Sequence, residues 1–207
     1  MKTIFPSNVR FLLLFACFLG ISQPSFAQLV KFGLRAGITG SNLYDDANAK
    51  DLNTRIGFIG GSFMKIGIGN RIAIRPELLF AMKGSNFNYQ TYQNTKLKLG
   101  YIELPVSLEL RILKIINLHA GVHADYLVNA DVSVQNPNPN PKITFTKEDL
   151  NLLDYGWHVG TGLELGPIGI HLRVSRGLKE VGKTSSVSNV VGNLKNATWS
   201  LTVAASL

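Results

Sequence analysis

Eight segments of this 207-residue chain alternate apolar and polar residues, and this alternation limits the possible folds more than any other feature. Between Tyr101 and Ile112, six apolar residues take every second position. A period of two is typical of a β-strand with one face in apolar surroundings. The segments are 30–40, 54–68, 71–83, 101–112, 115–129, 153–165, 168–178 and 195–207. The sequence therefore predicts an all-β protein of eight strands.

Alternation alone does not say whether the apolar face meets lipid or a closed interior. The connections do, because they alternate between short (69–70, 113–114, 166–167) and long (41–53, 85–94, 130–152, 179–194). Transmembrane barrels have short periplasmic turns and long outer loops. Strands of this length are also sufficient for the ~9–11 residues that cross a bilayer when tilted. We therefore expect an eight-stranded antiparallel up-and-down transmembrane β-barrel with short periplasmic turns, long extracellular loops and both termini periplasmic.

Aromatic residues on the apolar parity gather towards the long-loop ends of the predicted strands. Side chains of this kind form girdles at the membrane interface. The predicted membrane-interface aromatics are Phe58, Phe80, Tyr126, Tyr155, Trp157 and Trp199.

The N-terminus has the order of a secretory signal peptide. An apolar run from Phe11 to Ile21 follows Lys2 and Arg10 and precedes Ser25-Phe26-Ala27. We expect cleavage after residue 27, so 1–27 is the signal peptide and 28–207 the barrel domain. Cleavage removes the only cysteine, which excludes thiol chemistry, and lowers the formal charge from +8 to +6. The basic residues form no run or stripe, which argues against nucleic-acid binding.

Charged residues of both signs occupy the polar parity of the strands. An eight-stranded barrel is just wide enough for its own side chains, and unpaired charges inside it are costly. We therefore expect the two signs to neutralise one another in one cluster, with Glu77 and Glu103 on adjacent strands. Such a filled lumen excludes a polymeric substrate, so the protein is predicted not to be an enzyme. The predicted lumen ion-pair cluster is Arg35, Arg71, Arg75, Glu77, Glu103, Glu109, Arg111 and Arg173.

All four histidines, His119, His123, His158 and His171, also fall on inward positions. Hydrogen-bonded lumen histidines are the simpler interpretation, and the prediction is no metal and no cofactor. The alternative is a Zn²⁺ or Cu²⁺ site whose candidate ligands are His123, His158 and Asp125.

Two short stretches carry a family resemblance. Arg75-Pro76-Glu77-Leu78 and Tyr101-Ile102-Glu103-Leu104-Pro105, together with the signal peptide and Ala120-Gly121, resemble the Bacteroidota outer-membrane β-barrel family of porin-family or PorT-like proteins. The resemblance covers nearly all of the mature chain. It implies a multi-pass barrel in the outer membrane of a Gram-negative cell envelope and no particular chemistry.

Three functions are compatible with these patterns. The leading prediction is a non-enzymatic structural or interaction protein that acts through its loops or its periplasmic face, as a PorT-like accessory of an envelope or secretion complex would. The Asn-Pro repeat at 136–141 is either a recognition loop or a passive solvated cap. The alternatives are a narrow pore for ions or small solutes and a soluble lipocalin-like carrier of an apolar ligand. The expected partners are outer-membrane lipid and the barrel-assembly machinery.

Overall fold

A computed structural model describes residues 30–44, 52–89, 92–135, 150–182 and 195–207. The predicted signal peptide, 1–27, and the Asn-Pro repeat at 136–141 lie outside the described residues. No helix in the described residues is long and apolar enough to cross a membrane.

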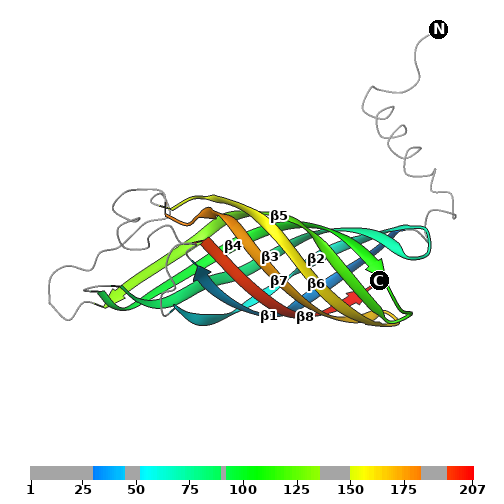
Figure 1. Cartoon of the computed structure of the whole chain (residues 1–207), viewed down its shortest axis with the longest axis horizontal. Coiled ribbons are helices and arrows are strands. Elements are labelled where there is room, and N and C mark those ends of the chain that lie inside the picture. The colour runs from blue at the N-terminus through cyan, green and yellow to red at the C-terminus, as the bar shows by residue number, and fades with distance from the viewer. Residues whose placement is uncertain (1–29, 45–51, 90–91, 136–149, 183–194) are drawn as a thin grey trace, which may run out of the picture.

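Eight antiparallel strands form one closed barrel (Figure 1). Each strand pairs with the next one along the chain, and β1 pairs with β8 from Gly33↔Ser206 to Tyr44↔Lys195, which closes the barrel. This confirms the predicted fold. The strands are β1 (Val30–Tyr44), β2 (Leu52–Ile68), β3 (Ile72–Tyr89), β4 (Tyr92–Arg111), β5 (Ile116–Gln135), β6 (Leu153–Leu165), β7 (Ile168–Glu180) and β8 (Lys195–Ser206).

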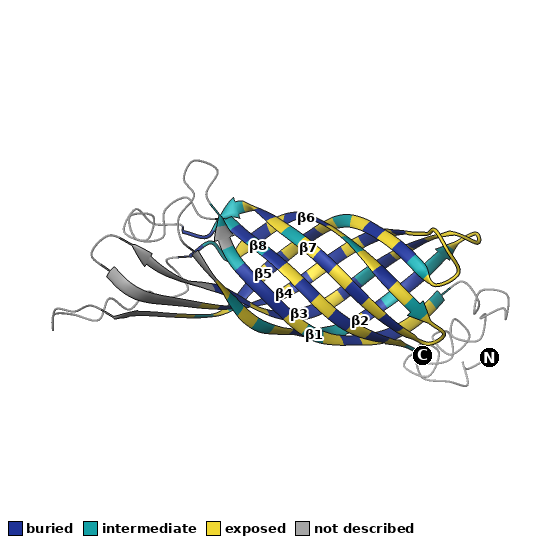
Figure 2. Ribbon diagram, turned by 60° about the horizontal axis from the view of Figure 1, so that its bottom comes forward, coloured by how far each residue is buried: buried dark blue, intermediate teal, exposed yellow. Residues whose placement is uncertain are grey.

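Apolar side chains cover the outside of the barrel, and the buried side chains are largely polar. Figure 2 shows buried and exposed residues alternating along every strand. On β4, the apolar residues from Ile102 to Leu110 are 39–58% exposed, whereas Glu103, Ser107 and Glu109 between them are buried. Trp157 and Trp199 also lie outside. The soluble lipocalin-like carrier needs this parity to point inward, so that alternative is wrong.

The two ends of the barrel differ in how the strands are joined. At one end, here called the turn end, the connections are residues 69–71, 112–115 and 166–167. Gly69 and Gly166 have φ values of 69° and 66°, a region that glycine adopts without steric cost and that tight turns require. The opposite end, here called the loop end, carries the connections 45–51, 90–91, 136–152 and 181–194. The predicted alternation of short and long connections is confirmed at three of these four positions, and it is wrong for β3–β4, whose connection is only residues 90–91.

The strands next to the loop end are longer than the sequence predicts. Residues 85–94 were expected to be a loop, but β3 continues to Tyr89 and β4 begins at Tyr92. Similarly, β5 runs to Gln135 rather than ending near residue 129. Apolar residues also alternate here, as at Leu97 and Leu99, but on the opposite parity to the outward residues that begin at Ile102, so they do not extend the predicted pattern. These strands are held by backbone pairing such as Asn86↔Lys96 and Lys98↔Asp131.

One inward–outward assignment on β5 is also wrong. Val128 was expected on the outward apolar face, but Gly100 pairs with Asn129 and Tyr101 pairs with Leu127. Val128 is therefore the extra residue of a β-bulge and is half-buried. A bulge shifts the period by one residue, which a fixed alternation cannot anticipate.

Candidate functional site

The centre of the lumen holds a cluster of three arginines around one carboxylate, here called the arginine cluster: Arg35, Arg75, Arg173 and Glu77. Glu77 on β3 accepts hydrogen bonds from Arg35 Nη1 at 2.6 Å, Arg173 Nη2 at 2.5 Å and Arg75 Nε at 3.1 Å. Arg35 also donates to Thr202 Oγ1 at 3.0 Å. The arginines come from β1, β3 and β7, so the cluster joins walls of the barrel that are not adjacent in the sheet.

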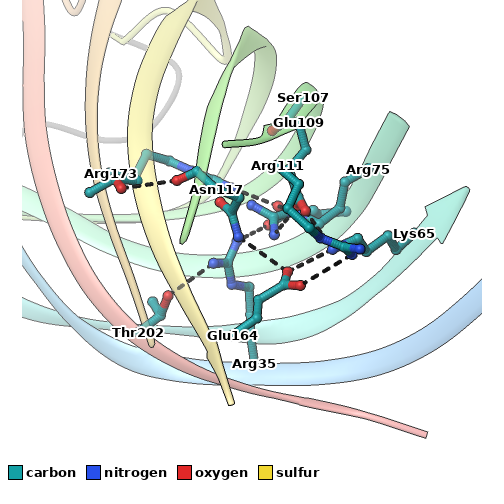
Figure 3. A network of polar contacts seen from close by, with 12 residues as sticks. Arg35, Lys65, Arg75, Ser107, Glu109, Arg111, Asn117, Glu164, Arg173 and Thr202 are labelled. Carbon is teal, nitrogen blue, oxygen red and sulfur yellow. Dashed lines mark hydrogen bonds and ion pairs between the residues drawn. The ribbon is translucent and has the colours of Figure 1, made fainter. Parts of the chain in front are cut away.

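A second set of contacts continues from this cluster to the turn end (Figure 3). Arg75 Nη1 donates to Glu109 Oε2 at 3.0 Å, and Lys65 pairs with both Glu109 and Glu164. Arg111 Nη2 lies 3.8 Å from Glu164 Oε2 at the rim of the barrel. Basic side chains therefore follow the lumen from its centre to its mouth.

Nearer the loop end, one ammonium group holds two carboxylates. Lys83 Nζ lies 2.6 Å from Glu103 Oε1 and 2.7 Å from Asp125 Oδ2, and all three side chains are buried. This group is here called the lysine cluster. The three side chains of this cluster come from β3, β4 and β5. The Lys83 ammonium also lies 5.2 Å from the ring centre of Tyr101.

The predicted single ion-pair cluster is thus divided in two. Glu77 and Glu103 were expected together because both point inward on adjacent strands, but Leu79, not Glu77, is the strand partner of Glu103. Glu77 belongs to the arginine cluster and Glu103 to the lysine cluster. The predicted inward parity of Glu77 and Glu103 was right. Parity does not give the position of a residue along the barrel axis, so it could not show that the two lie at different levels.

The structure places Arg71 outside both clusters. It lies in the β2–β3 turn, exposed, and its backbone carbonyl accepts a hydrogen bond from the Arg111 backbone N–H at 2.7 Å. Strand β3 begins one residue later, at Ile72, so Arg71 does not have the inward strand position that was expected for it. Arg71 is therefore a residue of the turn-end surface.

Some charged residues that point into the lumen were not among the predicted site residues. Lys65, Lys83 and Glu164 lie on the polar parity of their strands, which was the signal that could have selected them. Asp154 is buried on β6 and accepts a hydrogen bond from Asn196 Nδ2 at 2.9 Å. It stands at the start of its strand, where alternation has just begun.

The four histidines form a continuous row along one wall of the lumen. Ring centres are 5.9 Å apart for His171 and His119, 6.5 Å for His119 and His158, and 6.0 Å for His158 and His123. Nε2 of His158 and Oγ of Ser107 share a hydrogen bond of 2.8 Å. The row fits against glycines: a Cβ at Gly160 would lie 2.4 Å from His119 Nε2.

The three candidate metal ligands lie near one another without forming a coordination site. His123 Nε2 is 3.6 Å from Asp125 Oδ2, and that same oxygen accepts a hydrogen bond from Lys83. Among the described residues, no group of three or more His, Cys, Asp or Glu side chains could hold a metal ion. Asp125 is instead the ion-pair partner of Lys83, and the imidazole of His123 lies beside that pair.

The six predicted interface aromatics all lie on the outer surface of the barrel. Their side chains are exposed, and Phe80, Ile102 and Tyr126 follow one another across β3, β4 and β5 as direct strand partners. Their assignment to the level of the membrane interface remains a prediction. The aromatics are Phe58, Phe80, Tyr126, Tyr155, Trp157 and Trp199.

Comparison with known proteins gives the family. Residues 22–181 match the family described as "Outer membrane protein beta-barrel domain". No curated protein matches the chain in sequence.

Solved structures give the same fold. The Ail protein of Yersinia pestis is 13% identical, with a TM-score of 0.53, over 86% of this chain and 98% of that chain. A second Ail structure, in complex with the heparin analogue sucrose octasulfate, gives a TM-score of 0.52 at 12% identity, over 86% and 99% of the two chains. Neisserial surface protein A is 15% identical, with a TM-score of 0.50, over 84% and 96%. The chain belongs to the outer membrane protein β-barrel domain family and is a protein of the outer membrane.

Proposed function

We propose that this protein is a non-enzymatic interaction protein whose barrel anchors it in the outer membrane and whose exposed ends bind a protein partner. The observation that supports this most is the filling of the lumen. The arginine cluster joins β1, β3 and β7, and the lysine cluster joins β3, β4 and β5. A lumen crossed by buried ion pairs offers a solute no open path, which leaves the two ends of the barrel as the surfaces for binding.

The proposal includes an orientation and a route. Residues 1–27 are removed as a signal peptide, the barrel-assembly machinery inserts the chain, and the turn end faces the periplasm, because outer-membrane barrels keep their short turns there. In this orientation the protein serves as a PorT-like accessory of an envelope or secretion complex, in a member of the Bacteroidota. A periplasmic partner would then bind the turn end, and an external partner would bind the loop end.

Conductance in planar bilayers tests the closed lumen. The folded protein, identified by a heat-shifted band on a gel, should give no steady open state. A steady open state of the unmodified protein would instead make it a narrow pore for ions or small solutes.

Site-directed photo-crosslinking tests the interaction role. A photoreactive residue replaces Lys114 in the turn-end connection, Asp131 near the loop end, or Val122 on the lipid-facing surface, all three of which are exposed. We expect a discrete protein adduct from one of the two ends and none from position 122. Equal adducts from all three positions, or none from either end in the native envelope, would contradict the proposal.

A further inference from the structure

A cavity of about 390 Å³ lies at the turn end of the lumen. Gly69 and Arg71 of the β2–β3 turn and Pro167 of the β6–β7 turn line its mouth, and the buried side chains Arg75 and His171 line its wall. Neither the fold nor the proposed interaction role assigns anything to this space.

The cavity wall carries an excess of positive charge. Five basic side chains line it against two acidic ones, a formal excess of three positive charges. The basic residues are Lys31, Lys65, Arg71, Arg75 and Arg111, and the acidic ones are Glu109 and Glu164.

Both carboxylates are already engaged. Glu109 accepts from Lys65 and Arg75, and Glu164 accepts from Lys65 at 2.6 Å and from Asn117 Nδ2 at 3.2 Å. Within the described part of the chain, no carboxylate pairs with Lys31 or Arg71, and both are exposed at the mouth. The uncompensated charge is therefore at the mouth, where a ligand can enter.

An independent observation comes from the inner wall. Arg75 is 2% exposed, and its Nε and Nη1 donate to Glu77 and Glu109. Its Nη2 is buried without a hydrogen-bond partner among the described residues, and so is His171 Nδ1. Buried guanidinium N–H groups normally find an acceptor. An oxyanion in the cavity, or water that it holds, would supply one.

We propose that the turn-end cavity binds a phosphate group. A phosphate monoester carries about −1.5 to −2 charges and three acceptor oxygens, which suits an excess of three positive charges and unfilled guanidinium donors better than a carboxylate does. Arginine side chains also match phosphate geometry through paired N–H donors. The site is formed by the barrel itself and requires no protein partner. Its test is therefore independent of the test of the interaction role.

Isothermal titration of the purified, folded protein in an uncharged, phosphate-free detergent tests this. Inorganic phosphate should bind saturably, weaken as salt is added, and bind at least about tenfold more tightly than acetate. The double variant Lys31→Gln and Arg71→Gln removes the two charges that no carboxylate of the described residues pairs, and it should lose about tenfold or more in affinity, because each substitution removes one charge-assisted donor. A single-site control is Lys98→Gln, which removes one exposed charge near the loop end. The heat-shifted gel band verifies that each variant is folded.

Two phosphate monoesters then separate the sources of the ligand. Tighter binding of a short-chain phosphatidic acid than of glucose 6-phosphate identifies a lipid headgroup, and the reverse identifies a soluble phosphate. Either result supports the site. No saturable binding of inorganic phosphate, equal binding of acetate, or equal affinity of the double variant and the Lys98→Gln control would overturn it.

Discussion

The two charge clusters of the lumen are built on opposite ratios. In the arginine cluster three guanidinium groups share the one carboxylate of Glu77, whereas in the lysine cluster one ammonium group, Lys83, is shared by two carboxylates. Buried charges are costly unless paired. The difference teaches that charge in this narrow lumen is not balanced pair by pair. Each cluster depends on its single minority ion, which sits at the centre of several partners.

The two clusters also differ in how they can respond to losing that ion. A carboxylate can become neutral by binding a proton, but a guanidinium group in a protein cannot lose one. Loss of Glu77 therefore leaves charges that cannot discharge, and loss of Lys83 leaves charges that can. This asymmetry predicts a ranking of substitutions.

The largest effect is expected for Glu77→Gln. It keeps the shape of the side chain but leaves three buried arginines around a neutral amide, so the free energy of unfolding should fall by about 3–5 kcal/mol. Urea unfolding in lipid vesicles measures this, and the yield of the heat-shifted gel form reports the effect if the variant folds poorly. A loss below about 1 kcal/mol would show that Glu77 is not the centre of the cluster.

A smaller loss is expected for Lys83→Met, about 3 kcal/mol at pH 7. Without the ammonium group, Glu103 and Asp125 repel each other, and the folded state then favours binding of a proton by one of them. Protons bound in the folded state stabilise it as pH falls. The deficit of the variant relative to the unmodified protein should therefore shrink between pH 7 and pH 5, whereas that of Glu77→Gln should not. Parallel deficits in both variants would remove the proposed asymmetry.

Substitution of a majority ion should matter less. Arg173→Met removes one of three arginines and leaves Glu77 paired with Arg35 and Arg75, so no buried charge is left unpaired. We therefore expect a loss of about 1 kcal/mol, the net contribution of a single hydrogen bond. The same urea titration measures it. A loss as large as that of Glu77→Gln would mean that the three arginines are not interchangeable.

The smallest effect is expected for Lys98→Gln. Lys98 and Asp131 lie 3.9 Å apart, and each side chain is more than half exposed, at 53% and 57%. Exposed ion pairs contribute about 0–1 kcal/mol. The unfolding free energies of Lys98→Gln and of the unmodified protein should agree within about 0.5 kcal/mol, which gives the reference value for the buried clusters. A larger loss would indicate that Lys98 contributes more to the loop end than this one ion pair.

The alternation of residues was enough to predict the strand number and the two faces of each strand. The connection lengths, the strand lengths and the positions of the aromatic residues were needed in addition to predict a barrel whose apolar face points outward. Alternation could not predict contacts across the lumen, because these depend on the register between strands. Arg35 and Glu77 are 42 residues apart and Glu77 and Arg173 are 96 apart, on strands that are not neighbours. The same limit explains why Glu77 and Glu103 were expected together. The extensions of β3 and β4 were missed because their apolar residues, such as Leu97 and Leu99, lie on the opposite parity to the outward residues of the same strands.

The seam between β1 and β8 has a consequence for how this protein is made. Its partners lie far apart in the chain, and Arg35 donates to Thr202 across it, a separation of 167 residues. Contacts of such long range form slowly, because ordering the intervening chain costs conformational entropy before the contacts can stabilise the fold. Until Lys195–Ser206 is in place, the growing sheet has two unpaired edges and an apolar surface, both of which promote aggregation. The stability of the finished barrel is therefore reached through an intermediate that has to be kept apart from its own copies.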